Sequence, residues 1–590
     1  MKNNLVFLLK GKNLASKNTE KVFPLRRKKM ILFLLLNIIV WHNFEDPNEQ
    51  YPIQNQGFKD EIGKTFQRLP DRAKGIVSDR IFELSQHSAG LAVYFYTDSK
   101  SIVIKYTCTD AISFDHMAST GKSGIDLYAI DKDGKMHFLT GSYAIGGSST
   151  YTYSGLSGNL YRYKLYLPNY NRVTSLEIGV NAGKTFFFDD VSQEKPIAVY
   201  GTSIAQGACP NRPGNSWVNI VNRETSWPVI NFGFQGNGFL DKEVIDFIIE
   251  NDAKLFVLDC LPNLVDRTEE VTKNLIIDAV KQIRGKYPKT PILLVEHSGF
   301  SNMQFNNNQA QQIYNMNNAS QKAFDFLQKS GYKDELYYLS KEEMNVEGDN
   351  IVDTVHPMDD GNYLIARAYI KKLREIFKAP IGSEPTQIPL TQLYNTEFIQ
   401  RHEAILNWTH SVKPKNILIG DSIFNWWGGN PPCAKKNGEE SYNKFIEPLG
   451  FLNLGIANDR IENVLYRIYH EEIDDYELER IIILIGYNNL GIHTDDQILK
   501  GYKFLLDQIR KRQPTAQIKI IGMLPRSGKE ERIRGINVKL EKLVTESGNT
   551  FCDVTHHLVD DAGKVIEKYF VDGLHPNNDG YSLIAPDLVA

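Results

Sequence analysis

The stretch KPIAVYGTS (residues 195–203) decides the class of fold. Its apolar run does not alternate with polar residues, which is typical of a short strand buried on both faces of a parallel sheet. The run passes directly into Gly-Thr-Ser, so Ser203 is predicted to lie at the carboxyl end of this strand. Two further apolar segments, at 253–263 and 290–297, are separated by helical patterns. This alternation predicts an α/β domain with helices on both faces of its sheet.

Four short blocks of this region occur again, in the same order, further along the chain. The matched pairs are YGTSI (200–204) with IGDSI (419–423), NFGFQGNG (231–238) with NLGIANDR (453–460), LDCLPN (258–263) with LIGYNN (484–489), and DTVHPMDDG (353–361) with DGLHPNNDG (572–580). Ser203 and Ser422 are 422 − 203 = 219 residues apart, and Asp353 and Asp572 are 572 − 353 = 219 apart. The repeat indicates two α/β domains of the same design.

The first and last blocks contain the residue types of a serine esterase. A serine hydroxyl becomes nucleophilic when a neighbouring base accepts its proton, and histidine is the usual base near neutral pH. In the D-x-x-H motif a carboxylate and a histidine share one loop, so Asp353 is predicted to orient His356 for Ser203. The equivalent residues of the second domain are Ser422, Asp572 and His575.

The two middle blocks contain candidate donors for an oxyanion. A tetrahedral intermediate is stabilised by about 3–4 kcal/mol for each well-placed hydrogen-bond donor. The predicted donors of the first domain are the N–H of the serine, the backbone N–H of Gly236 and the side-chain amide of Asn263. In the second domain Asn488 corresponds to Asn263.

The region before the first α/β domain has the alternating pattern of antiparallel strands, which predicts a β-sandwich. A stretch rich in Pro and Gly, APIGSEPTQIPL, follows the first α/β domain and predicts a linker. The predicted organisation is a leader at 1–45, a β-sandwich domain at 46–195, α/β domains at 196–378 and 413–590, and a linker at 379–412.

These blocks resemble those of the SGNH (GDSL) hydrolase family, named for its Ser, Gly, Asn and His. The resemblance implies two flavodoxin-like three-layer α/β/α domains that hydrolyse esters without a metal or other cofactor. It places Asn458 where the family has its oxyanion glycine, with a backbone N–H still available. GIDLY (124–128) is similar to the G-x-D-L-Y motif of a bacterial subfamily in which a β domain precedes the hydrolase. The implied sites are Ser203, Gly236, Asn263, Asp353 and His356 in one domain, and Ser422, Asn458, Asn488, Asp572 and His575 in the other.

The three-part arrangement is similar to exported bacterial carbohydrate acetylesterases, including two-domain sialate O-acetylesterases. The resemblance therefore implies removal of acetyl groups from an extracellular carbohydrate, with acetylated sialic acid as one candidate. Three alternatives stay open. The second domain is a glycan-binding module that uses Trp426 and Trp427; the protein is a lipase or acyl-ester hydrolase of broader specificity; or it is a glycan-binding scaffold without catalysis.

The N-terminus indicates export. Four basic residues (26–29) precede an apolar run (30–41), which predicts a signal peptide and a secreted or periplasmic protein, with a retained signal anchor as the alternative. No stable membrane span is expected in the mature form. A net charge of −4 gives no reason to expect nucleic acid as a partner. Five scattered cysteines form no metal-binding pattern, so a metal-free protein is predicted.

Several single residues invite functional interpretations. Arg212 and Arg460 follow candidate blocks and could bind a carboxylate, but structural salt bridges are the favoured interpretation. His297 is a candidate for lining the first site, Glu296 beside it has no predicted partner, and His556 and His557 are predicted as loop residues. Pro586 predicts an interruption of the last helix.

Overall fold

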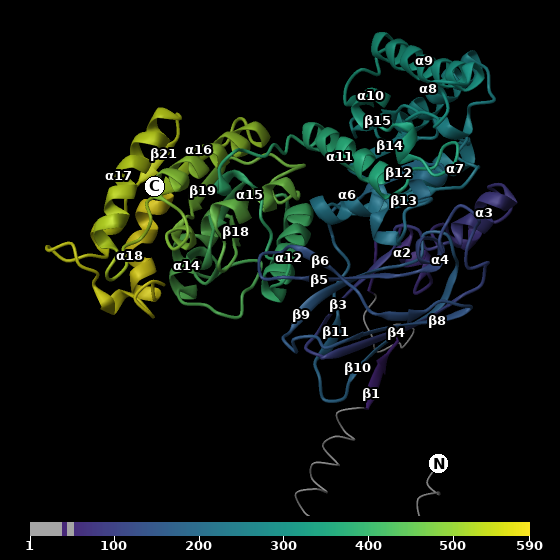
Figure 1. Ribbon diagram of the computed structural model, residues 1–590. Helices are drawn as coiled ribbons and strands as arrows, with labels where there is room; N and C mark the ends of the chain where they lie inside the picture. The colour runs from purple at the N-terminus through teal and green to yellow at the C-terminus, as the bar shows by residue number, and fades with distance from the viewer. Residues whose placement is uncertain (1–37, 44–51) are drawn as a thin grey trace, which may run out of the picture.

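The computed structural model describes residues 38–43 and 52–590 (Figure 1). Most of the predicted leader lies outside these residues. The end of its apolar run is described, and it forms strand β1 (Ile39–His42), which pairs antiparallel with β10 (Val173–Asn181). The β domain therefore begins earlier than the predicted boundary at residue 46. No helix within the described ranges is long and apolar enough to span a membrane.

The N-terminal domain is an antiparallel β-sandwich, as the alternating pattern predicts. Its sheets have the orders β1-β10-β4-β8-β7 and β11-β3-β9-β5-β6, with β2 paired to β3. Alternate residues such as Ile102, Ile104 and Leu165 form the core between the sheets. The other strands are β2 (Ile53–Gln54), β3 (Ala92–Thr97), β4 (Ser101–Cys108), β5 (Asp126–Ile130), β6 (Met136–Leu139), β7 (Ser142–Ala144), β8 (Ser148–Ser154), β9 (Tyr161–Tyr166) and β11 (Phe186–Phe188). Short helices α2 (Lys59–Ile62), α3 (Asp79–Ser85) and α4 (Ser119–Ser123) complete the domain.

The first hydrolase domain is a three-layer α/β/α sandwich around a parallel sheet of order β13-β12-β14-β15-β16. Its strands are β12 (Ile197–Gly201), β13 (Val229–Gly233), β14 (Leu255–Asp259), β15 (Ile292–Val295) and β16 (Leu336–Leu339). Val199 packs toward α6 (Trp217–Thr225) and α11 (Asp359–Ile376), whereas Tyr200 packs toward α7 (Lys242–Ile248), α8 (Glu269–Lys286) and α9 (Asn307–Lys329). Because both faces are covered, the strands are predominantly apolar.

The second hydrolase domain repeats this topology, with the sheet order β18-β17-β19-β20-β21. Its strands are β17 (Asn416–Gly420), β18 (Phe451–Gly455), β19 (Arg480–Leu484), β20 (Gln517–Ile521) and β21 (Thr550–Cys552). Its helices are α14 (Glu439–Phe445), α15 (Ile461–Tyr469), α16 (Asp495–Arg512), α17 (Glu530–Glu546) and α18 (Asn578–Val589). The predicted interruption at Pro586 is wrong, because α18 continues through this residue while Ile584 and Leu588 remain buried.

The predicted linker contains a helix that belongs structurally to the second hydrolase domain. Residues 396–412 form helix α12 (Thr396–Val412), whose buried Arg401 donates to two carbonyls of β18 at 2.7 and 3.1 Å. Arg68, from the β domain, does the same for the first hydrolase domain by donating to the carbonyls of Asn231 and Gly233 in β13, at 2.9 and 2.8 Å. These guanidinium groups satisfy buried carbonyls at the end of matching strands. Each hydrolase domain therefore completes its sheet with an arginine from the segment that precedes it.

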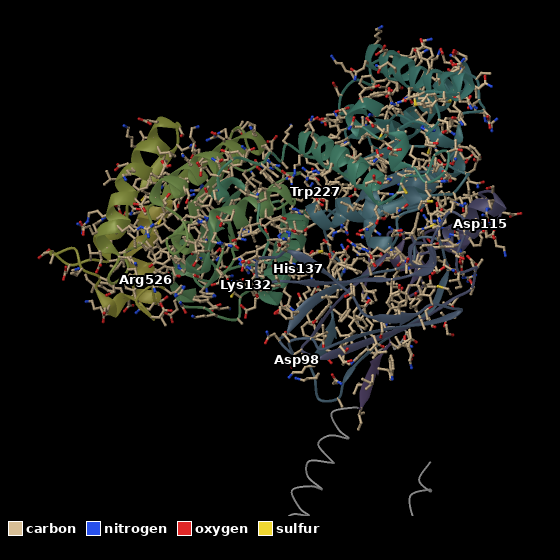
Figure 2. The ribbon with its side chains drawn as sticks, in the orientation of Figure 1. Asp98, Asp115, Lys132, His137, Trp227 and Arg526 are labelled. Carbon is tan, nitrogen blue, oxygen red and sulfur yellow. The ribbon has the colours of Figure 1, made fainter. Side chains whose placement is uncertain are left out.

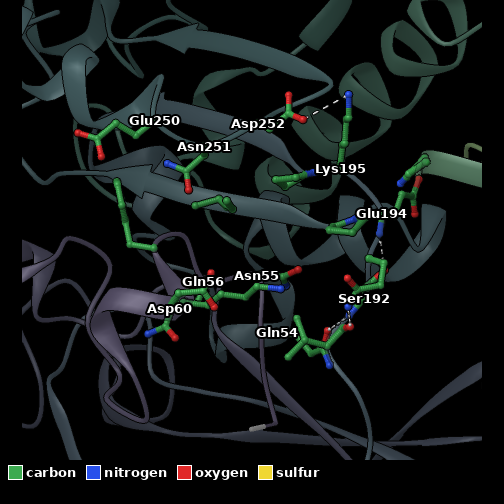
Figure 3. Close-up of a pocket in the computed structure, with 18 of the residues that line it drawn as sticks. Gln54, Asn55, Gln56, Asp60, Ser192, Glu194, Lys195, Glu250, Asn251 and Asp252 are labelled. Carbon is green, nitrogen blue, oxygen red and sulfur yellow. Dashed lines mark hydrogen bonds and ion pairs between the residues drawn. The ribbon is translucent and has the colours of Figure 1, made fainter. Parts of the chain in front are cut away.

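The three domains meet at a polar cavity of about 690 Å³ that contains neither candidate triad (Figure 3). It is lined by Gln54 of the β domain, by Glu194 and Lys195, and by Asp475 of the second hydrolase domain. The ammonium group of Lys195 pairs with Asp475 at 3.0 Å, and buried Glu194 accepts from His470 at 2.8 Å. The Lys195–Asp475 ion pair and the Glu194–His470 hydrogen bond join the two hydrolase domains, so the polar residues around this cavity hold the domains together.

Candidate active sites

Both serines lie at the carboxyl end of the first strand of their domain, as predicted. β12 ends at Gly201 and β17 at Gly420, and each serine opens a short helix two residues later. The residue between them caps that helix: the Thr202 hydroxyl accepts from the N–H of Ile204, and Asp421 does the same in the second domain. In open α/β sheets this edge is where ligands bind.

The first candidate triad is assembled by the loop that precedes α11. The Oγ of Ser203 is 2.8 Å from Nε2 of His356, whose Nδ1 is 2.7 Å from Asp353. The other oxygen of Asp353 accepts from the backbone N–H groups of Val355 and His356. Partial burial opposes ionisation of this carboxyl, but these hydrogen bonds outweigh it and lower its pKa. Asp353 is therefore held as a carboxylate that fixes the imidazole.

The second candidate triad has the same geometry. The Oγ of Ser422 is 2.8 Å from Nε2 of His575, and Nδ1 of His575 is 2.7 Å from Asp572. Hydrogen bonds again outweigh burial and lower the pKa of Asp572. Burial lowers the pKa of His575, and the nearby charges of Lys435 and Arg526 add to this effect against the opposing influence of Asp572. His575 is therefore set to be neutral, as a general base must be.

The predicted oxyanion donors occupy equivalent positions of the two sheets. Gly201 pairs with Gly233 and Asp259, and Gly420 pairs with Gly455 and Leu484. Each candidate donor follows the paired residue of its strand by the same number of residues in both domains. These offsets are 236 − 233 = 458 − 455 = 3 for the backbone donors and 263 − 259 = 488 − 484 = 4 for the asparagine amides. Gly236 thus corresponds to Asn458, and Asn263 to Asn488.

Asn458 reproduces the backbone of the glycine that it replaces. Its φ of 66° equals that of Gly236, in the left-handed region that asparagine tolerates better than most residues. In the described part of the chain, neither N–H donates to a backbone carbonyl, so both are free to serve a ligand. Asn488 is fixed by donating to the Asp459 carbonyl at 2.8 Å, which leaves one amide hydrogen available. Asn263 is fixed through its oxygen, which accepts from Gly238.

The wall of the first site comes from the β domain. The His116 ring lies nearly parallel to the His356 ring, with centroids 5.6 Å apart, and Phe114 stacks on His116. The sulfur of Cys209 and one ring nitrogen of each histidine lie within 4.8 Å of one another. Asp115, labelled in Figure 2, marks this loop on the side of the molecule opposite the second hydrolase domain.

The wall of the second site comes from its own domain. The Trp426 ring lies 4.2 Å from the His575 ring, between centroids, and the ammonium group of Lys435 lies 3.5 Å from the Trp426 centroid. Trp426 and Gly207 are matched positions, since 426 − 422 = 207 − 203 = 4. A Cβ at Gly207 would lie 2.5 Å from the Asn169 amide of the β domain. The first domain therefore has no room for such a side chain.

The two tryptophans that the sequence suggests for sugar binding differ in solvent accessibility. Trp427 is fully buried, donates to the Ser441 hydroxyl at 2.7 Å and stacks on Tyr581. Its predicted role in sugar stacking is therefore wrong, because the ring belongs to the core. Trp426 is half-buried beside the candidate base and keeps a surface for a ligand.

Both arginines form the salt bridges that the sequence favours. Arg212 binds Asp126 at 2.7 Å and the Tyr128 hydroxyl at 2.7 Å, so the GIDLY motif attaches the β domain to the hydrolase. Arg460 pairs with Glu462 at 3.3 Å.

The remaining predicted polar residues lie in structural positions. His297 is buried against Phe300, and burial lowers its pKa to about 3. Within the described residues its hydrogen bonds are with Asn317 and Gly299, so its expected place in the lining of the first site gains no support. Glu296 accepts from the Tyr338 hydroxyl at 2.8 Å, and His557 binds Asp587 at 2.8 Å.

Three residues near the sites carry no signal in the sequence: His116, Lys435 and Arg526. They lie in irregular loops outside the repeated blocks. Only the tertiary structure brings them beside the two histidines.

Comparison with known families identifies the domains. Residues 39–186 match the family described as the N-terminus of Esterase_SGNH_hydro-type (GxDLY), and residues 194–374 and 418–583 each match the GDSL-like lipase/acylhydrolase family. The fold and these matches define a carboxylic ester hydrolase with two hydrolase domains. The chain belongs to the GDSL-like (SGNH) hydrolase family and carries an N-terminal GxDLY domain.

Individual relatives agree with this assignment. Platelet-activating factor acetylhydrolase IB subunit alpha1 of Bos taurus is 26% identical over 34% of this chain and 84% of its own length. The alpha2 subunit of Rattus norvegicus is 29% identical over 32% and 81%. A crystal structure described as a GDSL-like lipase from Bacteroides ovatus is 27% identical, covers 58% of this chain and 98% of its own, and superposes with a TM-score of 0.53.

Proposed function

We propose that the protein is a serine esterase that removes O-acetyl groups from an extracellular carbohydrate, with one active site in each hydrolase domain. The observation that carries the proposal is the duplicated Ser–His–Asp chain. In both domains the serine Oγ lies 2.8 Å from the histidine Nε2, and the histidine Nδ1 lies 2.7 Å from a carboxylate oxygen. This geometry supports activation of the serine by a general base.

The reaction proceeds through an acyl-enzyme. His356 accepts the proton of Ser203 as its Oγ attacks the ester carbonyl, and the oxyanion accepts hydrogen bonds from the Ser203 N–H, the Gly236 N–H and the Asn263 amide. The imidazolium then gives the proton to the departing sugar oxygen. Water, deprotonated by the same histidine, attacks the acyl carbon. The bond between this carbon and the serine Oγ then breaks, which releases acetate, and the imidazolium returns the proton to Oγ. The second site performs the same steps with Ser422, His575, Asn458 and Asn488.

The two parts of the proposed substrate, the acetyl group and the sugar, are supported by different observations. Acetyl specificity is favoured by the curated relatives, whose names describe acetylhydrolases. A carbohydrate is favoured by the half-buried Trp426 ring beside the second base, since aromatic rings offer apolar faces to sugars. The arrangement of a GxDLY domain before a hydrolase also resembles exported carbohydrate acetylesterases. The predicted leader supports an extracellular location.

The test is acetate release by purified wild type, Ser203→Ala, Ser422→Ala and the double variant. The substrates are p-nitrophenyl acetate, O-acetylated sialic acids and acetylated plant glycans. Each single variant should lose a separable part of the activity, and the double variant should lose all of it. Ser142→Ala, at an exposed serine in strand β7 of the β domain, is the matched control.

The outcomes separate the candidate functions. Full loss in Ser203→Ala alone would make the second domain a binding module, and turnover that survives in the double variant would refute the proposal. Hydrolysis of p-nitrophenyl acetate without release of acetate from any glycan would retain the esterase but reject the carbohydrate.

A further inference from the structure

Two cations flank the second candidate site from different loops. Lys435 lies in the loop before α14, with its ammonium group 3.5 Å from the centroid of Trp426, the ring that packs on His575. Arg526 lies in the loop after β20, with its guanidinium carbon 5.6 Å from the centroid of Tyr487. Tyr487 immediately precedes the candidate oxyanion residue Asn488. Lys435 thus contacts the ring that packs on the candidate base, and Arg526 contacts the ring of the residue that precedes a candidate oxyanion donor.

Neither cation is neutralised by the protein. Lys436, next to Lys435, pairs with Glu439, and Arg532 in α17 pairs with Asp495. Across residues 38–43 and 52–590, no ion pair includes Lys435 or Arg526, and both side chains are exposed. The nearest acid of the site, Asp572, is already bound to His575. Two uncompensated positive charges beside one ester site create a field that attracts anions.

The field acts at the reacting groups. Both charges disfavour the protonated form of His575, in addition to the effect of burial. A substrate held beside His575 would lie in the same positive field. Figure 2 shows Arg526 at the far side of the second hydrolase domain, away from the β domain, so the β domain does not cover this cation.

The first site has a different residue at the position that matches Arg526. β15 and β20 pair in the same register with their neighbouring strands, so Val295 corresponds to Ile521. Because 300 − 295 = 526 − 521 = 5, the counterpart of Arg526 is Phe300, an apolar residue that packs on His297. The counterpart of Trp426, which holds Lys435, is Gly207. The charge pattern is thus an addition to the second site and not part of the shared hydrolase design.

We infer that the second site is specific for acetylated sugars that themselves carry a carboxylate, which Lys435 and Arg526 bind while the triad cleaves the acetyl ester. A guanidinium group can bind a carboxylate through two parallel hydrogen bonds, and an ammonium group adds a point charge. Trp426 positions Lys435 through a cation–π contact. This inference rests on the proposed function, since it assigns the substrate class of one of its two sites.

The test uses Ser203→Ala, in which only the second site turns over. The matched substrates are an acetylated methyl glucuronoside and the corresponding methyl glucoside, which differ only in carrying a carboxylate or a hydroxymethyl group. O-acetylated sialic acid and its carboxamide provide a second pair. The kcat/KM of the acidic sugar should exceed that of its neutral partner by about tenfold, mainly through KM. The ratio should fall at higher salt, because the charges are exposed.

Variants identify the residues responsible. Lys435→Gln and Arg526→Gln should each reduce the ratio severalfold, and together they should bring it near one, whereas Lys435→Arg should keep it. Arg526→Phe introduces the residue of the first site and should have the same effect as Arg526→Gln. Lys436→Gln, at the neighbouring paired cation, is the control that should leave the ratio unchanged. Hydrolysis of p-nitrophenyl acetate by each variant reports whether the site is still assembled.

Each outcome decides between the two proposals. Equal rates on acidic and neutral sugars, or a preference that survives Lys435→Gln/Arg526→Gln, would overturn the inference and leave the esterase intact. Failure of Ser203→Ala to hydrolyse any ester would refute the second active site. In that case the inference is tested by measuring, with saturation-transfer NMR, whether unacetylated methyl glucuronoside binds to the Ser203→Ala/Ser422→Ala variant. Binding that Lys435→Gln/Arg526→Gln abolishes would support it, and no binding would overturn it.

Discussion

The two hydrolase domains hold the same arrangement of candidate catalytic groups in different surroundings. Their serine–histidine and histidine–carboxylate distances agree to 0.1 Å. The ring beside the histidine, however, is His116 from the β domain in the first site and Trp426 from the hydrolase domain itself in the second. The same strand register places the candidate catalytic groups at equivalent positions in both domains, whereas the loops around these groups differ. The candidate catalytic groups and the walls around them can therefore change independently in this fold.

The largest effect should come from removing either histidine. His356→Gln in a Ser422→Ala background, and His575→Gln in a Ser203→Ala background, should each lower kcat by about 10⁶-fold, because the serine loses its base. The measurement is p-nitrophenol release. His137→Gln, at an exposed histidine of the β domain, should change nothing. A smaller loss at one site than at the other would show that the two triads do not work alike.

Replacing the triad acids should have the next largest effect. Asp353→Asn and Asp572→Asn should each lower kcat by about 10⁴-fold, because an amide favours the wrong tautomer of the histidine. Each variant is measured with the serine of the other domain changed to alanine. Asp349→Asn, at an exposed acid that precedes the first triad loop, is the control. A loss below tenfold at either position would contradict the assigned role.

The oxyanion donors should contribute less than the triad. Asn263→Ala and Asn488→Ala should each cost about 10²–10³-fold in kcat. Asn458→Gly should retain activity, because the donor is the backbone N–H and glycine adopts the same φ of 66° without strain. Asn159→Ala, in an exposed loop of the β domain, controls for the substitution itself. A large loss in Asn458→Gly would show that its side chain takes part.

A smaller difference concerns pH. In Ser203→Ala, kcat/KM should fall with decreasing pH through the pKa of His575, which lies below the ordinary value of 6.5. The sign follows because burial, Lys435 and Arg526 all disfavour the imidazolium, so the base stays neutral to lower pH. Lys435→Gln should move this acid limb upward by a few tenths of a pH unit at low salt. An acid limb above pH 6.5 in Ser203→Ala would contradict the assignment.

The sequence was sufficient for the parts that depend on periodicity and repetition. The apolar strands, the sandwich and both triads follow from local patterns and from the common offset of 219 residues. The roles of Arg68 and Arg401 did not, because a buried arginine that caps a strand in another segment has no local signature. Helix α12 falls within the predicted linker because the Pro- and Gly-rich stretch before it dominates the local pattern.

The residues that form the walls of the two candidate sites could not be predicted from the sequence either. His116 contacts His356 across the interface between the β domain and the first hydrolase domain, an interface that also contains the Arg212–Asp126 salt bridge. Trp427 directly follows Trp426 in the sequence, yet its ring is buried against Tyr581 whereas the Trp426 ring lies beside His575. Such contacts depend on how loops and domains pack, and they leave no periodic pattern in a single sequence.

Covalent labelling shows whether one chain carries two activated serines. Wild type is incubated with a fluorophosphonate, which reacts with serines activated by a neighbouring base, and the intact mass is then measured. We expect two adducts on wild type, one on Ser203→Ala, one on Ser422→Ala and none on the double variant. A single adduct on wild type that disappears completely with one serine would contradict it and assign catalysis to one domain.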